Sequence, residues 1–324
     1  MKKILVSGGA GYIGSVLVRL LLQKGYSVRV LDNLSFGGEP ILDLLTHSNF
    51  SFVKGDIRHP ETVKKAVEGI DFVAHLAAIV GDPACAINPE ITRAINLEAT
   101  QQFYELSNAA GVQKFVFAST CSNYGKMSDP NAYVDENSEL MPVSLYAETK
   151  VAAEKYLLSQ NKNNECKPTC LRFSTVYGLS QRPRFDLTVN EFVKDLSLGR
   201  ELVIFGEQFW RPYCHVNDLA RSVELVYSSE EHKTAFEVFN VGDTTENFQK
   251  KMIAAEIKKF IPGAIIKYVE KTEDPRDYKV NFSKIESRLG FKITRKLSDG
   301  IKEIMQAVND GFILEPDAAK YRNS

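Results

Sequence analysis

A glycine-rich turn at the start of the chain constrains its fold more than any other feature. A short apolar segment, residues 4–6, runs directly into Gly8-Gly9-Ala10-Gly11-Tyr12-Ile13-Gly14, and a helical pattern follows at 12–24. Glycines let the chain turn tightly, and they let backbone N–H groups approach a pyrophosphate at the positive end of a helix. The motif alone is weak evidence, but a strand before it and a helix after it predict a dinucleotide-binding turn.

The first half of the chain alternates strand and helix signals. Short apolar segments stand at 4–6, 28–31, 52–53, 72–76, 115–118 and 169–173. Helical patterns stand between them at 12–24, 60–67, 90–110 and 145–158. This alternation predicts an α/β fold, a Rossmann-type doubly wound parallel sheet with helices on both faces. Such sheets bind their ligands at the carboxyl ends of the strands.

The pattern changes after about residue 178. Helices are expected at 187–198, 216–227, 246–260, 283–289 and 298–308, and strands at 202–205 and 236–241. We expect residues 1–178 to form a cofactor-binding Rossmann domain, with late strands of the second half able to return to its sheet. Residues 179–324 are expected to form mainly a smaller α/β substrate domain, with the active site between the two.

An acidic residue at the end of the second strand indicates which dinucleotide binds. Asp32-Asn33 follows the strand at 28–31, about 20 residues past the glycines, where a carboxylate bonds the adenosine ribose hydroxyls. A carboxylate repels a 2′-phosphate, so NAD is predicted rather than NADP, although an ordinary turn aspartate is the alternative. Asp56 follows the third strand and fits two interpretations, an acceptor for the adenine amino group or a cap for the helix beginning near Pro60.

Tyr146 and Lys150 form the predicted catalytic pair. They stand four residues apart, hence on one helix face. A nearby ammonium favours the phenolate, which can take a proton from a sugar hydroxyl as hydride leaves the same carbon. Such pairs are common on helices, but Thr120 adds weight, because it ends the strand at 115–118 and can hydrogen-bond the reacting hydroxyl.

With these residues in place, the chain resembles the extended short-chain dehydrogenases/reductases of the NAD-dependent nucleotide-sugar epimerase/dehydratase family. Later segments also match, including Leu171-Arg172-Phe173, Arg211-Pro212-Tyr213-Cys214-His215-Val216 and Phe239-Asn240-Val241-Gly242. The resemblance covers nearly the whole chain and implies a set of NAD contacts. They are Gly8, Gly11, Tyr12, Ile13, Gly14, Asp32, Asn33, Asp56, Ile57, Leu76, Ala77, Ala78, Asn96, Tyr146, Lys150, Phe173 and Val176.

The resemblance also implies a mechanism, in which NAD oxidises the sugar at C4 before the subtypes diverge. Dehydratases of this family carry a carboxylate just after the catalytic threonine, whereas this chain has Cys121 and Ser122. A 4-epimerase is therefore the leading prediction. The alternatives are a 4-dehydrogenase or 4-ketoreductase, then a 4,6-dehydratase or a non-catalytic NAD-binding regulator. Cys121 fits two interpretations, an acid/base for epimerisation or, more commonly, a buried filler.

Arginines are expected to hold the pyrophosphate of a nucleotide-diphosphate sugar. The substrate contacts predicted by position or by resemblance are Val80, Ser122, Asn123, Arg184, Asn190, Arg211 and Arg276. Arg182 is a further candidate, but a solvated surface arginine is its more plausible interpretation. The loop 79–85 should face the hexose, while His75, His215 and Asp218 are expected to have structural roles.

Composition limits the remaining function classes. Lys+Arg 40 against Asp+Glu 41 gives a net charge of −1, which argues against a nucleic-acid surface. Five cysteines without zinc-site spacing predict no metal and a reducing compartment. No segment is long and apolar enough for a membrane, so a cytoplasmic protein is expected. The resemblance further implies a homodimer through helices 90–110 and 145–158.

Overall fold

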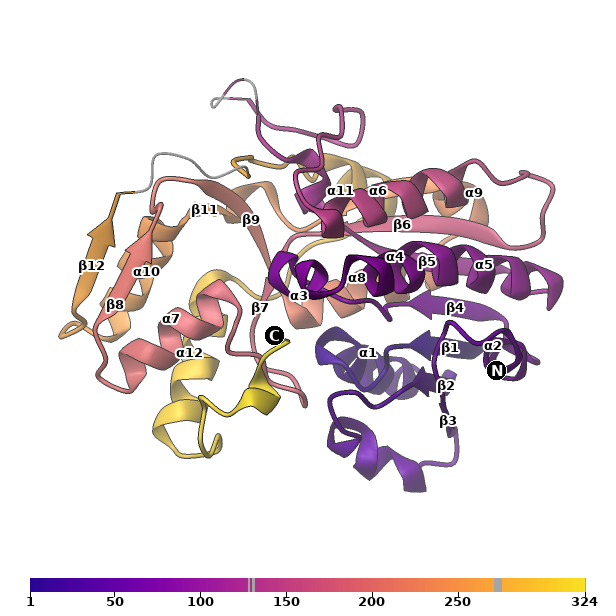
Figure 1. The fold of residues 1–324 in the computed structure, drawn as a ribbon, viewed down its shortest axis with the longest axis horizontal. Coiled ribbons are helices and arrows are strands. Elements are labelled where there is room, and N and C mark those ends of the chain that lie inside the picture. The colour runs from indigo at the N-terminus through magenta and orange to yellow at the C-terminus, as the bar shows by residue number, and fades with distance from the viewer. Residues whose placement is uncertain (128, 130–131, 271–275, 324) are drawn as a thin grey trace.

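In the computed structural model, which describes residues 1–127, 129, 132–270 and 276–323, seven parallel strands form the central sheet (Figure 1). In spatial order they are β10 (Glu237–Val241), β6 (Lys167–Phe173), β5 (Lys114–Thr120), β4 (Phe72–His75), β1 (Lys3–Ser7), β2 (Ser27–Asp32) and β3 (Phe50–Lys54). At its centre Val6 lies opposite Val30 of β2 and Ala74 of β4, all fully buried. The predicted α/β fold with a parallel Rossmann-type sheet is confirmed.

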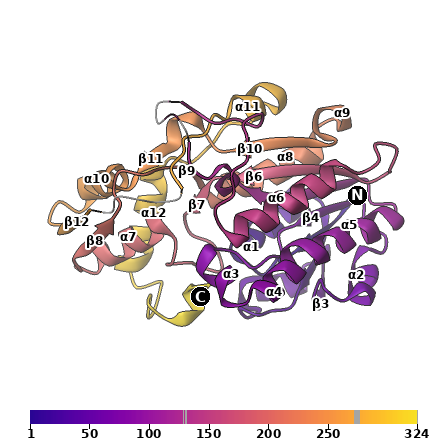
Figure 2. The same cartoon turned by 45° about the horizontal axis from the view of Figure 1, so that its top comes forward.

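Two layers of helices cover this sheet (Figure 2). On one face, α1 (Tyr12–Gln23), α8 (Val216–Ser228) and α11 (Ser283–Leu289) share a hydrophobic core with the strands. On the other face, α2 (Pro60–Val67), α5 (Ala99–Ala109) and α6 (Leu145–Leu158) form a second core. Both cores are apolar because a parallel sheet between helices buries both of its faces.

The second half of the chain builds a smaller α/β region beside the sheet (Figure 1). Its strands form two small sheets, β11 (Asn247–Gln249), β9 (Trp210–His215) and β7 (Thr175–Tyr177) in one, and β12 (Ile266–Val269) with β8 (Leu202–Phe205) in the other. Three helices share its core, namely α7 (Thr188–Ser197), α10 (Lys250–Phe260) and α12 (Leu297–Asn309). The shorter helical segments of the chain are η1 (Glu39–Thr46), α3 (Asp82–Ile87), α4 (Pro89–Arg93), η2 (Ala94–Glu98), η3 (Cys121–Tyr124), α9 (Glu231–Thr234), η4 (Thr244–Glu246) and η5 (Ala319–Tyr321).

The expected elements and the observed ones differ mainly in the second half. The helix predicted at 246–260 is wrong over its first four residues, since Asn247 starts an edge strand instead. Its side-chain oxygen accepts a hydrogen bond from Val280 N (2.8 Å), and its amide donates to Val280 O (2.9 Å), which holds the extended backbone. The helix predicted at 90–110 consists of α4, a π-helical turn and α5. Strands β7, β9 and β12 were not predicted.

The structure also bears on the expected absence of a membrane span and on the expected return of a late strand to the first sheet. Within the described ranges, no helix has the length and apolar character needed to cross a bilayer. Strand β10, from the second half, pairs with β6 of the first half. The division into domains 1–178 and 179–324 and the homodimer through 90–110 and 145–158 both stay predictions.

Candidate functional site

The glycine turn forms a close-packed junction between β1 and α1. Gly8 has φ +75°, and a Cβ at this position would lie 2.8 Å from the backbone N of Ala77. A Cβ on Gly14 would lie 2.1 Å from the carbonyl oxygen of Gly8. Only glycine therefore fits either position, and α1 begins with Tyr12 directly above the turn. The free N–H groups at the start of α1 make this junction suitable for a pyrophosphate.

Two carboxylates stand at the ends of β2 and β3. Asp32 accepts hydrogen bonds from Ala10 N (3.0 Å) in the glycine turn and Leu34 N (2.8 Å), and burial raises its pKa. Asp56 accepts hydrogen bonds from the Arg58 guanidinium, which lower its pKa. The capping interpretation of Asp56 is wrong, because His59 is the N-cap residue of α2. Asp32 thus joins the glycine turn to the end of β2, where the adenosine ribose is predicted to bind.

The segment after β4 lies against the glycine turn. Leu76 N donates to Ser7 O (3.1 Å), so residues 76–78 run beside the cradle. Asn96, in the π-helical turn, is fully buried, and its amide bonds both the N–H and the carbonyl of Ile79. His75 is buried between Ser7 (2.7 Å) and Thr100 (2.9 Å), and burial lowers its pKa to about 3. His75 is therefore structural, as expected, and Asn96 shapes the segment that would border a cofactor.

Thr120, Tyr146 and Lys150 meet where β5 ends and α6 begins. Ser144 is the N-cap residue of α6, since its hydroxyl accepts a hydrogen bond from Ala147 N (3.3 Å). The Tyr146 side chain hydrogen-bonds Thr120, but burial outweighs that bond and raises the pKa of the phenol. The predicted catalytic residues are therefore brought together, with the phenol protonated until other charges act on it.

Lys150 is a buried ammonium with few partners. It is 3% exposed, its Nζ donates to Ala118 O (2.9 Å), and it stands over the Phe117 ring at 4.6 Å. Burial lowers the pKa of Lys150 to about 8. Helix α6 thus holds a buried positive charge one turn after Tyr146, at a cost in folding free energy that is typical of groups at functional sites.

We expect Lys150→Met to remove turnover while raising the free energy of unfolding at pH 7 by on the order of 1 kcal/mol. The folded pKa, about 8, lies below the usual 10.5, so the unfolded chain binds the extra proton between these values. Stability of the unchanged protein should therefore rise with pH through this window, and less so in the variant. Urea unfolding of the unchanged protein and of the variant at pH 7 and pH 9.5 measures the two free energies of unfolding and their dependence on pH.

Lys114→Met is the matched control for that substitution. Lys114 is also buried, but its Nζ donates to three carbonyls, those of Val226, Tyr227 and Ser229. Removing it leaves these acceptors unpaired, so the free energy of unfolding should fall. Equal destabilisation by both substitutions would contradict the functional placement of the Lys150 charge.

A cavity of about 170 Å³ lies next to the turn that follows Thr120, one of the predicted catalytic residues. Its lining is Ser122, Thr175, Thr188, Phe209, Arg211, Tyr213, Lys250 and Arg276. Three of the predicted substrate residues, Ser122, Arg211 and Arg276, are therefore brought together there. Lys250, the first residue of α10, was not predicted, because it lies outside every motif of the sequence. The three cations make this cavity suitable for an anion such as a diphosphate.

Arg276 also reaches the loop after β4. Its Nη1 lies 2.8 Å from Asp82 Oδ2, and Asp82 Oδ1 accepts a hydrogen bond from Ser144 (2.7 Å). The loop 79–85, which was expected to face the hexose, is thereby joined both to the start of α6 and to the cavity. Neither contact was predicted, because the three residues come from distant parts of the sequence.

Three other predicted substrate residues contact the protein itself. Asn190 is 1% exposed, and its amide donates to the Tyr12 hydroxyl (3.2 Å) and to the carbonyls of Gly178 (3.1 Å) and Arg184 (2.8 Å). Asn123 is fully buried, with its amide on Ser119 (3.1 Å) and Glu154 (3.4 Å). Arg184 pairs with Asp186 (2.7 Å). The structure places all three outside the cavity lining.

The comparison with known proteins decides the family. A family described as "NAD dependent epimerase/dehydratase family" matches residues 4–242. The chain belongs to the NAD-dependent epimerase/dehydratase family. It is 30% identical to a putative UDP-glucose 4-epimerase from Methanocaldococcus jannaschii over 93% of this chain and 97% of that protein. It is 29% identical to a dTDP-glucose 4,6-dehydratase from Streptomyces niveus over 95% and 93%.

A solved structure supports the same family. The UDP-glucuronic acid 4-epimerase from Bacillus cereus, in complex with UDP-glucuronic acid and NAD, superposes with a TM-score of 0.84. It is 28% identical, and the match covers 96% of this chain and all of that one. The chain is thus an enzyme of the extended short-chain dehydrogenase/reductase type, and its cofactor is NAD.

The residues of this epimerase/dehydratase family member fit NAD. Gly8 and Gly14 let the turn pack closely against the backbone, which places the N-terminus of α1 where it suits a pyrophosphate, and Asp32 stands beside the turn at the end of β2. All the individual contacts with NAD and with substrate stay predictions, including those for which the structure shows no particular arrangement, namely Asn33, Ile57, Ala78, Phe173 and Val176 for NAD and Val80 for substrate. Among the described residues, no cluster of His, Cys, Asp and Glu suited to a metal ion occurs.

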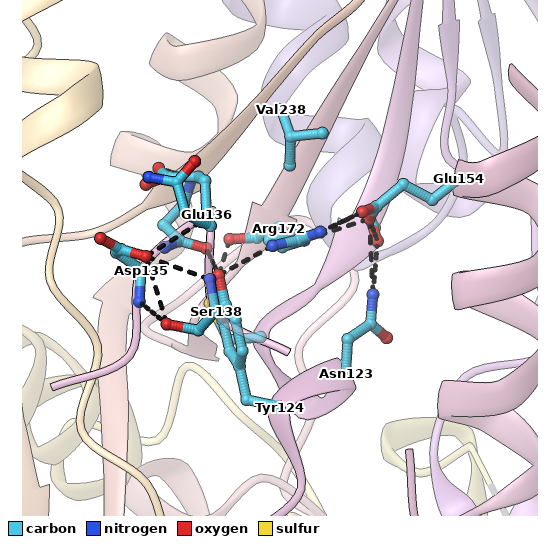
Figure 3. A network of polar contacts seen from close by, with 12 residues as sticks. Asn123, Tyr124, Asp135, Glu136, Ser138, Glu154, Arg172 and Val238 are labelled. Atoms are coloured by element: carbon cyan, nitrogen blue, oxygen red, sulfur yellow. Dashed lines mark hydrogen bonds and ion pairs between the residues drawn. The ribbon is translucent and has the colours of Figure 1, made fainter. Parts of the chain in front are cut away.

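A buried network of polar contacts holds the turn after β5 in this family member (Figure 3). Glu154 of α6 and Arg172 of β6 form an ion pair, 2% and 5% exposed in their side chains. Ser119 and Asn123 donate to Glu154, while Arg172 donates to the Tyr124 hydroxyl (2.9 Å). The network therefore holds both ends of the segment that carries Thr120 and Ser122.

Cys121 lies in the same turn and faces the protein interior. It is 1% exposed, its Sγ lies 3.2 Å from Arg172 O, and burial raises its pKa. A thiol in that state is a poor base, so the structure favours the filler interpretation over the acid/base one.

Proposed function

We propose that this enzyme epimerises the hexose of a nucleotide-diphosphate sugar at C4 through transient oxidation at that carbon. The observation that carries the proposal is the turn after Thr120. Ser122 of this turn lines the cavity, with its side chain hydrogen-bonded to Tyr278, and the other candidate group, Cys121, is buried. A hydroxyl can hold a sugar, but it is a far weaker base than the carboxylate that a dehydration at C5 requires.

Each catalytic residue has one role in this proposal. NAD, when bound, accepts the hydride from C4 and supplies it again. Tyr146 takes the proton of the C4 hydroxyl, and Thr120, hydrogen-bonded to Tyr146, orients that hydroxyl. Lys150 supplies the positive charge that favours the phenolate. Burial raises the Tyr146 pKa and the charge of Arg184 opposes that rise, so in this proposal Lys150 adds to a positive charge that already acts on the phenol.

The nearby carboxylates support an epimerase over a dehydratase. Asp82 is engaged by Ser144 and Arg276, and Glu154 is engaged by Arg172. Glu136 accepts a hydrogen bond from Asn240 N (2.7 Å), and burial raises its pKa. Each of these acids therefore already has a structural partner. The second candidate, a 4-dehydrogenase or 4-ketoreductase, uses the same three residues and differs in releasing its cofactor each turnover.

Purified protein incubated with a panel of UDP-, GDP-, dTDP- and CDP-hexoses tests the proposal. We expect one class of sugar to give a C4 epimer by NMR, without a net change in NADH absorbance. Stoichiometric NADH would identify a dehydrogenase instead, and a 4-keto-6-deoxy sugar would identify a dehydratase. Relatives named for UDP-glucose, UDP-glucuronate and dTDP-glucose make pyrimidine nucleotides the first to try.

Arg211→Leu should raise the KM for the nucleotide sugar about 10- to 100-fold and leave kcat within a few-fold. The reason is that Arg211 lines the cavity, where its guanidinium can bind the diphosphate equally in the ground and transition states. Arg295→Leu, at an exposed position, is the control and should change neither constant. Loss of kcat alone would place Arg211 at the reaction rather than at the diphosphate.

A further inference from the structure

The loop 178–186 crosses from the second half of the chain to the start of α1. The Tyr12 hydroxyl donates to the carbonyl of Gly178, and the Asn190 amide donates to Tyr12, Gly178 and Arg184. Tyr12 is the first residue of α1 and lies between Gly11 and Gly14 of the glycine cradle. The loop is therefore anchored beside the region that binds the pyrophosphate of NAD.

Arg182 of this loop contacts the segment at the end of β2, where the adenosine ribose of NAD is predicted to bind. It is 5% exposed, so the solvated-surface interpretation of Arg182 is wrong. Its guanidinium carbon lies 3.7 Å from the centre of the Phe36 ring. Phe36 belongs to the loop that follows Asp32. The charge of Asp32 acts on Arg182 and that of Arg182 on Asp32, so the two lie close together. Burial lowers the pKa of Arg182 to about 10, which leaves it charged at neutral pH.

The C-terminal segment accepts hydrogen bonds from the Arg182 guanidinium. Arg182 Nη1 donates to Asn323 Oδ1 (2.7 Å), and Nη2 donates to Arg322 O (3.0 Å). Phe185 N donates to Tyr321 O (2.9 Å), and Asn323 N donates to Asp186 Oδ2 (3.1 Å). Both views show the C-terminal end close to α1 and far from the outer edge of the smaller region (Figures 1 and 2). We call residues 178–186 together with 317–323 the strap.

The Arg182–Phe36 contact joins the strap to the N-terminal half at the ribose end. Phe36 is 47% exposed and belongs to the loop after β2, whereas Arg182 belongs to the loop between β7 and α7 in the second half of the chain. Among the described residues, Arg182 Nε has no hydrogen-bond partner. The cation–π contact with Phe36 is therefore the interaction that stabilises the guanidinium where it faces the N-terminal half. Opening the region between the two halves must separate this pair.

We propose that the strap, closed by Arg182 on Phe36, gates the adenosine end of the NAD site and slows both entry and release of the dinucleotide. A cofactor that is reoxidised within each catalytic cycle has no need to leave, and a closed strap suits such a cycle. The proposal rests on NAD binding and applies to epimerisation and to any other reaction of the family in which the cofactor is reoxidised before it leaves.

Rates of NADH association and dissociation test the gate. The full-length protein, stripped of nucleotide, is mixed with NADH in a stopped-flow fluorimeter, and bound NADH is then displaced with excess NAD. For Phe36→Ala we expect koff to rise about tenfold, equivalent to about 1.4 kcal/mol, and kon to rise several-fold. Arg182→Ala should act in the same direction, and Arg182→Lys, which lacks the flat guanidinium, should be intermediate.

The association rate distinguishes a gate from a simple contact. Loss of a direct contact with the dinucleotide raises koff and leaves kon unchanged, whereas removal of a gate raises both. Arg288→Ala is the control, because Arg288 also donates to backbone carbonyls, of Lys233 and His232, but lies on α11. Unchanged rates in Phe36→Ala, a rise in koff alone, or an equal effect of Arg288→Ala would each overturn the proposal. Because Phe36 is half-exposed, its variant folds even where Arg182→Ala does not.

Discussion

Tyr146→Phe should lower kcat on the nucleotide sugar by about 10²- to 10⁴-fold, the usual contribution of a positioned general base. Phenylalanine keeps the ring between the same neighbours and removes only the hydroxyl that bonds Thr120. Although Tyr146 is itself a predicted NAD contact, we expect the amount of NAD bound per chain to change little, because the aromatic ring is kept and the cradle at Gly8 and Gly14 lies on a different element. Steady-state kinetics and nucleotide content by absorbance, on the same preparation, measure the two effects.

Tyr104→Phe is the control for losing a buried phenol. The Tyr104 hydroxyl donates to Cys166 O (3.0 Å), within the core between α5 and β6. Its loss should cost about 1 kcal/mol of folding free energy and leave kcat within two-fold. A Tyr146→Phe enzyme that kept full activity would remove Tyr146 from the proton transfer.

Arg172→Met should lower the free energy of unfolding by about 3–5 kcal/mol, because it leaves the Glu154 carboxylate buried without its cation. The Arg172 Nε donates to both carboxylate oxygens of Glu154, at 3.1 and 3.2 Å. Burial acts to lower the pKa of Arg172, but the charge and hydrogen bonds of Glu154 outweigh it and raise the pKa. Urea unfolding with NAD at a fixed concentration measures the loss.

The double variant Arg172→Met/Glu154→Leu shows whether the loss of stability comes from the unpaired Glu154 charge or from losing the Arg172 side chain itself. With both charges removed, we expect most of the stability to return, since apolar replacements of a buried pair are often neutral. Lys64→Met, which removes an exposed partner of Glu61, should change stability by less than about 0.5 kcal/mol. A single variant as stable as the double one would contradict the view that an unpaired charge causes the loss.

The regular part of the fold was predictable because each signal is local. The segment 4–6 and the glycines after it specify a strand, a tight turn and a helix within twenty residues. The helix at 145–158 has the predicted bounds, because Ser144 caps it and its buried positions recur at helical spacing. Tyr146 and Lys150 were found by that same spacing, and Thr120 by its place at a strand end.

The missed features depend on contacts between distant segments. Strand β9 contains Trp210, Arg211 and Pro212, a sequence without strand periodicity, and is extended because β7 and β11 pair with it. Arg182 was expected in solvent, since nothing near it in the sequence shows that residues 322–323 and Phe36 enclose it. Asn190 carries an amide suited to a ligand, but the structure uses it to hold Tyr12 and the loop 178–186.

The fate of a deuterium label at C4 tests the central claim most directly. The enzyme is given a nucleotide hexose deuterated at C4, and product and cofactor are examined by NMR. The proposed epimerase returns the label to C4 with inverted configuration and leaves none on released NADH. Label recovered at C6 of a 4-keto-6-deoxy product, or on free NADH, would contradict the proposed reaction.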